Sequence, residues 1–355
     1  MNDLNSDFSI NFMIEIDGSI GGGQLLRTAI GLSALTNKSV EISNIRKGKT
    51  GKPGLRPQHM MGIKVTGEFC QAEIKGLEES SLEVEFTPKK LNVYDKEIDI
   101  GTAGSIGLLL QTITPVLVFI DKPVTLQIRG GTETRWAPTI QYIRDVAFPI
   151  LNMMGTNLSL ELIKHGYYPK GGGRVGVISK PVKKLDPFVY LERGSIKSIH
   201  ISSVCGRLPP NVAERQGKSA LRTIQYHCPD IKVSMDYKSV DSFSPGSSVN
   251  CYAVCENSII GSSCLGERGL RAEVVGEKAA DDLVKALKSN AALDKFMADQ
   301  ILVFLALAKG NSRVRVEEVT EHCRTNISII EQILPVEFKT NENIIEVEGI
   351  GFEKP

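Results

Sequence analysis

Apolar positions along the chain follow two periods, one typical of helices and one typical of strands. Apolar residues three and four apart predict helices over Gln24–Leu35 and Gln58–Phe69. Short alternating or apolar runs around them predict four strands, at Phe12–Ile16, Val40–Ile45, Ala72–Lys75 and Ser81–Phe86. The order strand, helix, strand, helix, strand, strand predicts an α/β unit with one mixed sheet.

The same order returns twice at a spacing of roughly 80 residues, which predicts repeated supersecondary units around a shared axis. The second round has helices at Gly104–Ile120 and Pro138–Met154, and the shorter third round has helices at Asp294–Ala308 and Thr325–Leu334. The strands expected with them are Val124–Ile128, Leu158–Ile163, Gly173–Ile178, Arg313–Val316, Glu337–Lys339 and Ile344–Glu348. The three repeats therefore span about residues 12–86, 97–180 and 291–350.

Residues 188–289 interrupt the series of repeats, between the second and the third, with a pattern of their own. Helical spacing occupies Asn211–Tyr226 and Ala272–Leu287, and strands are expected between and before them. About 100 residues suffice for an independent core. We predict a large domain of residues 1–187 and 290–355, into which a small α/β domain of residues 188–289 is inserted.

Alignment of the repeats places a polar side chain at one position of the first helix in each, namely Arg27, Gln111 and Gln300. These helices are otherwise apolar. Two interpretations stay open at this point: the three side chains meet at a common central site, or they occupy solvated edge positions.

Charge and composition exclude several classes of protein. The chain has 355 residues, 41% hydrophobic and 23% charged, with a net charge of +1, which argues against disorder and against a protein that coats nucleic acid. No signal peptide or membrane span is apparent, and the seven scattered cysteines resemble ordinary reduced thiols. We expect a cytoplasmic enzyme or binding protein without a membrane partner.

Two loops near the N-terminus have the composition of anion-binding segments. Asp17–Gln24 is a glycine-rich link from strand to helix, where backbone N–H groups can approach a phosphate, although such a cluster is as often only a tight turn. Arg46–Arg56 carries five basic residues among prolines and glycines. This segment lacks the spacing of a P-loop. Its basic residues either bind phosphate or form a solvated charged face.

Two further clusters lie in later segments. Lys164–Arg174 combines basic residues, two tyrosines and three glycines, which suits single-stranded nucleic acid; a hairpin whose tyrosines cover the core is the alternative. Asp299 and Gln300 stand early in an apolar helix, where a carboxylate needs a partner or ligand. His322 lies where a strand gives way to a helix, although a lone histidine is more often structural.

Taken together, these segments resemble the RNA 3′-terminal phosphate cyclase family. The shared motifs occur in the family's order and cover nearly the whole chain: D-G-S at Asp17, G-G-G-Q-x-L-R ending at Arg27, P-G-L-x-x-Q-H ending at His59, G-x-A-G-S ending at Ser105, H-G-Y-Y-P-x-G-G-G from His165, A-D-Q ending at Gln300 and H-x-x-T-N from His322. The resemblance implies three βαβαββ-type units with an inserted thioredoxin-like domain.

The resemblance also implies a ligase that converts an RNA 3′-phosphate into a 2′,3′-cyclic phosphodiester with ATP as co-substrate. His322 would form a histidine–AMP intermediate through its tele nitrogen, and AMP would then pass to the RNA end. The residues implied for ATP binding are Gln111, Phe296, Met297, Ala298, Asp299 and Gln300; those implied for phosphate or RNA binding are Gln24, Arg27, Arg46, Lys49 and Gln58. Mg²⁺ or Mn²⁺ would be required, and assembly into a homodimer stays open.

Two departures from the family pattern bear on the chemistry. The first glycine loop is two residues shorter than usual and lacks the glutamate that serves the family as a metal ligand, which leaves Asp17 as a weak substitute. Lys49 stands where arginine is common and loses the bidentate fork. The alternatives are a non-catalytic relative that acts as an RNA or ribosome-biogenesis interaction module, and a nucleotidyl transferase that adenylylates other phosphorylated ends.

Overall fold

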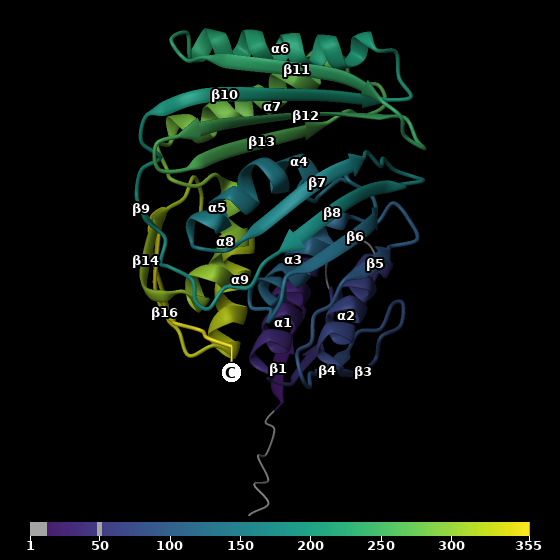
Figure 1. Cartoon of the computed structure of the whole chain (residues 1–355), viewed down its shortest axis with the longest axis vertical. Helices are drawn as coiled ribbons and strands as arrows, with labels where there is room; N and C mark the ends of the chain where they lie inside the picture. Colours follow the sequence, from purple (N-terminus) through teal and green to yellow (C-terminus); the bar gives the residue numbers. More distant parts are fainter. Residues whose placement is uncertain (1–12, 48–51, 355) are drawn as a thin grey trace, which may run out of the picture.

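The computed structural model (Figure 1) describes residues 13–47 and 52–354, in which the strands form four sheets of four strands each. The first unit begins at β1 and ends at β4. Its elements are β1 (Ile14–Asp17), α1 (Gly23–Thr36), β2 (Val40–Ser43), α2 (Pro57–Cys70), β3 (Glu73–Lys75) and β4 (Val84–Thr87).

The second unit repeats this order and ends at β8. Its elements are β5 (Lys96–Asp99), α3 (Ile106–Val118), β6 (Val124–Gly130), α4 (Ile140–Tyr142), the π-helical turn η1 (Ile143–Ala147), α5 (Phe148–Met153), β7 (Leu158–Lys164) and β8 (Gly173–Ser179). The single helix expected over Pro138–Met154 is therefore wrong in detail, because η1 interrupts it. Pro149 has no N–H to continue the helical ladder, and the Phe148 N–H donates to the Ile143 carbonyl instead.

The third unit is split by the inserted segment. Its elements are β9 (Val189–Tyr190), α8 (Lys295–Leu307), β14 (Lys309–Arg315), α9 (Glu321–Ile333), β15 (Phe338–Asn341) and β16 (Ile344–Ile350). β9 pairs with β14 in parallel, although more than 100 residues separate them along the chain. Residues 189–190 thus belong to the sheet of the third unit, and the insertion lies between the first strand and the first helix of that unit.

All three units share one topology. The sheet orders are β1-β2-β4-β3, β5-β6-β8-β7 and, read from its first strand, β9-β14-β16-β15. In each sheet the first two strands in this order are parallel and the other neighbours are antiparallel. This confirms the α/β class. Each of the second and third units has one strand more than the sequence analysis expected, namely β5 and β9, so that all three units have four strands.

The inserted segment has a sheet and a hydrophobic core of its own. Its elements are β10 (Ile196–Gly206), α6 (Asn211–His227), β11 (Val233–Val240), β12 (Gly246–Cys255), β13 (Ile259–Leu265) and α7 (Ala272–Lys288), with sheet order β11-β10-β12-β13. α6 and α7 approach so closely that a Cβ at Gly276 would lie 2.0 Å from the Gln216 carbonyl oxygen. The two ends of the segment meet where the Arg193 N–H donates to the Asn290 carbonyl at 3.4 Å.

The helices of the three units pack together in one core, with the sheets outside. α1 lies in the middle of this core, with almost every residue from Gln24 to Leu35 buried, and it contacts α2, α3 and α9. A Cβ at Gly31 would lie 2.7 Å from the Thr112 carbonyl oxygen, so the absence of a side chain lets α1 and α3 approach closely. In the part of the chain that the structure describes, no helix has the length and apolarity of a membrane span.

Candidate active site

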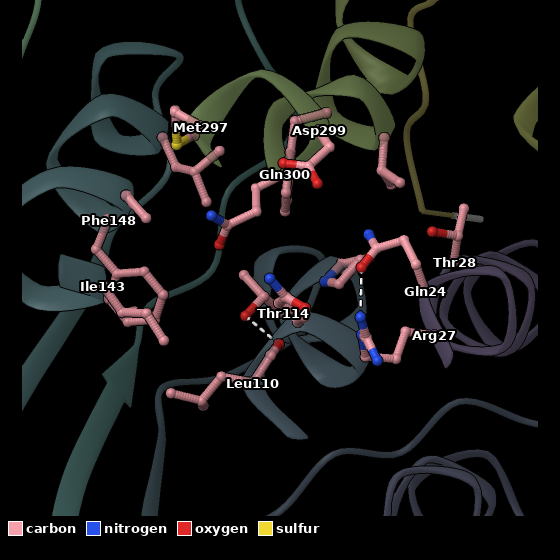
Figure 2. A pocket seen from close by; sticks show the side chains of 16 residues that line it. Gln24, Arg27, Thr28, Leu110, Thr114, Ile143, Phe148, Met297, Asp299 and Gln300 are labelled. Carbon is pink, nitrogen blue, oxygen red and sulfur yellow. Dashed lines mark hydrogen bonds between the residues drawn. The ribbon is translucent and has the colours of Figure 1, made fainter. Parts of the chain in front are cut away.

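The first helix of each unit contributes to one cavity at the centre of the molecule, which we call the central cavity. It measures about 360 Å³ and is lined by residues including Gln24 and Arg27 of α1, Gln111 of α3, and Phe296, Asp299 and Gln300 of α8; His322 of α9 completes it. The structure thus brings together Arg27, Gln111 and Gln300, which favours the common site over the solvated edge positions that the alignment also allowed. Figure 2 shows the inner end of this site, where Gln24, Arg27, Asp299 and Gln300 face one another.

Arg27 brings a buried guanidinium to the cavity. Its guanidinium donates to the Gln24 Oε1 atom (Figure 2), and its Nε has no hydrogen-bond partner among the described residues. Removal from water lowers the pKa of Arg27 to about 10, while Asp299 opposes the shift. A guanidinium of this kind, still charged at neutral pH, is suited to a phosphate group.

Asp299 lies on α8, and its burial disfavours the charged form of its carboxylate. Removal from water raises the pKa of Asp299 from 3.8 to about 7, with Arg27 acting in the opposite direction. Across the cavity, the Gln111 Oε1 atom is buried and has no partner among the described residues. The Gln111 oxygen is therefore available to a ligand that donates a hydrogen bond, because burying such a group without a partner is costly.

Asp294, at the N-cap of α8, fixes the aromatic wall of the cavity. Its carboxylate accepts from the Phe296 and Met297 N–H groups, each at 2.9 Å, and from the Tyr142 hydroxyl at 2.7 Å. The Phe296 ring packs edge-on against Tyr142, with centroids 6.2 Å apart, and keeps 42% of its surface exposed. An exposed aromatic face held in this way can stack a planar base.

His322 lies in the first turn of α9 and is exposed on the central cavity. One turn later, the buried Asn326 connects three helices: its Oδ1 accepts from the Thr28 hydroxyl and its amide donates to the Asp299 carbonyl, both at 2.8 Å. Asn326 is a positioning residue that the sequence analysis quoted in the H-x-x-T-N motif without assigning it a role. It holds α9, and therefore His322, against the helices that carry Arg27 and Asp299.

His59 is a second residue that the sequence analysis did not place in the site. Burial and the neighbouring Arg27, Arg46 and Arg56 lower the pKa of His59 to about 3, so the imidazole is neutral at physiological pH. Its Nδ1 accepts from the Arg56 N–H at 3.2 Å, which leaves the proton on Nε2. That atom faces α1, since a Cβ at Gly23 would lie 2.5 Å from it.

The other residues that the sequence analysis expected in the site lie in different parts of the structure. Gln58 lines a smaller cavity with Arg27 and His59, and Met297 lines the inner end of the central cavity. Ala298 is fully buried in the core. The Arg46 guanidinium donates to the Lys52 carbonyl at 3.0 Å and does not line the central cavity, and Lys49 lies outside the described residues.

Asp17 and the glycine loop offer no preformed metal cage. The Asp17 carboxylate accepts from the Ser19 N–H at 3.0 Å, the Ser19 hydroxyl at 2.8 Å and the Asn44 amide at 3.3 Å, and it does not line the central cavity. Within residues 13–47 and 52–354, no three His, Cys, Asp or Glu side chains cluster as metal ligands. These residues therefore do not fit a metal site made of protein ligands alone. They are compatible with a Mg²⁺ ion that substrate phosphates and water hold.

Comparison with known proteins identifies the family of the chain. The family model described as RNA 3′-terminal phosphate cyclase matches residues 19–340. Curated proteins named RNA 3′-terminal phosphate cyclase are similar over nearly full length: one from Pyrobaculum aerophilum is 44% identical, covering 96% of this chain and 99% of its own, and one from Methanopyrus kandleri is 43% identical, covering 91% and 94%. Another, from Methanosarcina barkeri, is 42% identical, covering 94% and 99%. The chain belongs to the RNA 3′-terminal phosphate cyclase family.

Proposed function

We propose that this protein is an ATP-dependent RNA 3′-terminal phosphate cyclase that works through a histidine–AMP intermediate at His322. The observation that carries the proposal is the central cavity, in which His322 shares the lining with the Arg27 guanidinium and the exposed Phe296 ring. A nucleophile, an anion-binding group and a base-stacking surface are the three parts that nucleotidyl transfer needs. Membership of the family supports the same conclusion.

In the first step, the Nε2 atom of His322 attacks the α-phosphorus of ATP. The bond between the α-phosphorus and the bridging oxygen breaks, diphosphate leaves, and a phosphoramidate joins the imidazole to AMP. Arg27 would compensate the charge that develops on the phosphates, since its guanidinium is partly desolvated before the ligand arrives. The neutral His59 would donate a hydrogen bond from Nε2 in the same region.

The nucleoside of ATP would lie against Phe296 in the central cavity. Phe296 provides a stacking face for adenine, and the Gln111 Oε1 atom, which no described residue contacts by a hydrogen bond, provides an acceptor for an amino group or hydroxyl. Asp299 supplies a second acceptor, whose charged form becomes accessible near neutral pH. This orientation directs the triphosphate toward Arg27 and His322.

The second and third steps transfer and release AMP. An oxygen of the RNA 3′-phosphate attacks the phosphorus of the histidine-bound AMP, which frees the imidazole and forms an RNA–AMP anhydride. The neighbouring 2′-hydroxyl then attacks the terminal RNA phosphorus, AMP leaves, and the 2′,3′-cyclic phosphodiester closes. Because the hydroxyl and the phosphate belong to one ribose, proximity accelerates this closure.

A divalent cation, Mg²⁺ or Mn²⁺, is part of the proposal as a partner of the ATP phosphates. When bound, it would withdraw charge from the leaving diphosphate. Among the described residues that line the central cavity with Arg27 and His322, Asp299 is the only carboxylate that could contribute a ligand to this cation.

The proposal is tested by incubating the protein with ATP labelled at the α-phosphate, with and without Mg²⁺ or Mn²⁺. We expect acid-labile label on the parent protein and none on His322→Ala. His227→Ala is the matched control, since His227 ends α6 in the inserted segment and should leave labelling unchanged. Label retained by His322→Ala, or absent from the parent protein, would contradict the mechanism. A companion assay follows a 3′-phosphorylated oligonucleotide becoming resistant to phosphatase.

A further inference from the structure

A continuous cleft leads away from the central cavity and passes between the three-unit body and the inserted segment. Its middle part, the interdomain cleft, measures about 760 Å³ and shares Leu108, Thr134, Trp136 and Leu265 with the central cavity. Beyond it, a distal groove of about 490 Å³ on the inserted segment shares the stretches Pro245–Ser247 and Gly266–Arg268 with the cleft. The three cavities form one path that begins beside His322.

Two aromatic side chains stand exposed along this path. Trp136, the only tryptophan in the chain, keeps 93% of its surface exposed, and Tyr168 keeps 78%. The Trp136 backbone has φ 59°, a left-handed conformation that a bulky residue rarely adopts. An indole presented to solvent on a strained backbone is unfavourable for folding alone, which indicates a role in binding.

Buried contacts hold the two loops that carry these rings. The Glu133 carboxylate contacts the His165 Nδ1 atom at 2.9 Å, and the Gly166 N–H donates to the Thr132 hydroxyl at 2.9 Å. Tyr167 is buried against the inserted segment, where a Cβ at Gly246 would lie 2.2 Å from its ring. Of the two neighbouring tyrosines, Tyr167 therefore anchors the loop, and Tyr168 is left to face the cleft.

Charge along the path suits a polyanion. Arg135 and Arg268 line the interdomain cleft, and Arg215, Arg268 and Arg271 line the distal groove. Arg135 is paired with Glu267 across the cleft at 3.1 Å, and Arg268 and Arg271 are exposed. Stacking faces interleaved with cations are typical of surfaces that bind single strands without reading their sequence.

We propose that the interdomain cleft and distal groove hold the single-stranded RNA on the 5′ side of the reacting phosphate. Trp136 and Tyr168 stack successive bases, while Arg268 and Arg271 contact the backbone. This inference rests on the proposed function for the direction of the strand, because the reacting end must lie beside His322. It assigns to the inserted segment the role of one wall of the RNA site.

The sole tryptophan makes the inference directly measurable. Titrating the protein with a 3′-phosphorylated RNA of about ten nucleotides, without ATP, should quench Trp136 fluorescence in a saturable and salt-dependent manner. Tyr168→Ala should raise the Kd about tenfold, as expected for the loss of one base stack. Tyr226→Ala is the matched control, because Tyr226 on α6 is 82% exposed but does not line the cleft, and its Kd should equal that of the parent protein.

Labelling with ATP separates this inference from the proposed function. Tyr168→Ala should form histidine–AMP as fast as the parent protein, which also shows that the variant is folded. RNA that leaves the fluorescence unchanged, or equal affinities for Tyr168→Ala and Tyr226→Ala, would overturn the RNA path even if His322 is adenylylated. Absence of labelling together with normal RNA quenching would instead overturn the adenylylation mechanism and leave the path in place.

Discussion

Replacing Asp299 by asparagine should stabilise the protein at pH 8 in the absence of nucleotide. The carboxylate lies at the inner end of the central cavity, where burial raises its pKa from 3.8 to about 7. Ionising it in the folded protein therefore costs free energy that the unfolded chain does not expend. Asparagine has nearly the same shape and stays neutral at every pH, so Asp299→Asn removes this cost.

The magnitude follows from the difference between the two pKa values. About three pKa units at about 1.4 kcal/mol each set an upper limit of about 4 kcal/mol, which partial exposure of Asp299 reduces to about 2–3 kcal/mol. Because the folded pKa is the higher one, the cost is absent below about pH 4, grows between pH 4 and 7, and is constant above pH 7. The gain from Asp299→Asn should follow the same curve.

Urea unfolding at pH 5 and pH 8, followed by circular dichroism, measures this gain. Asp294→Asn is the informative control, because that buried carboxylate accepts four hydrogen bonds, from the Tyr142 hydroxyl and the N–H groups of Gly261, Phe296 and Met297. It should lose stability at both pH values. An Asp299→Asn variant that is less stable than the parent at pH 8, or equally stabilised at pH 5 and pH 8, would refute the reasoning.

Two further substitutions examine how the site is held together. Asn326→Ala removes one buried and one partly buried hydrogen bond and leaves the Thr28 hydroxyl without its acceptor, so the free energy of unfolding should fall by about 1–3 kcal/mol. A loss below about 0.5 kcal/mol in urea unfolding would contradict the positioning role. Gly23→Ala would place a Cβ 2.5 Å from the His59 Nε2 atom and 3.0 Å from an Arg27 nitrogen, and should slow adenylylation at least tenfold, since a factor of ten requires only about 1.4 kcal/mol. Gly22→Ala, whose Cβ would meet nothing within 4 Å in the described structure, should label at the parent rate, and equal rates for both variants would count against the contact.

The sequence predicts those helices and strands in which the apolar periodicity extends over enough residues to be recognised. α1, α2, α3 and α8 begin and end within a few residues of the expected positions. Arg27, Gln111 and Gln300 line one cavity, which is one of the two interpretations that their alignment left open. β5 and β9 escaped detection. β5 has one buried apolar residue, Ile98, and β9 has two residues and pairs with a strand beyond the insertion.

The site is less completely predictable for a different reason. His59 and Asn326 act through neighbours distant in sequence, and only the fold shows that Asn326 meets Thr28 or that three arginines surround His59. The exposed position of Trp136 is still harder to predict, because hydrophobicity alone would place a tryptophan inside the protein. The Trp136 backbone has a left-handed conformation that no local sequence pattern predicts.

The hydrogen bond between Arg193 and Asn290 has a consequence for how the chain closes its third sheet. β9 can pair with β14 only after the chain has returned across about 100 residues, and closing a flexible loop of that length costs about 4 kcal/mol in entropy. The inserted segment has its own core and brings its two ends together, so it shortens the effective loop to about 20 residues and removes about 1.5 kcal/mol of that cost. Once folded, the insertion thus serves as a rigid connector, and it lets a two-residue strand find its partner.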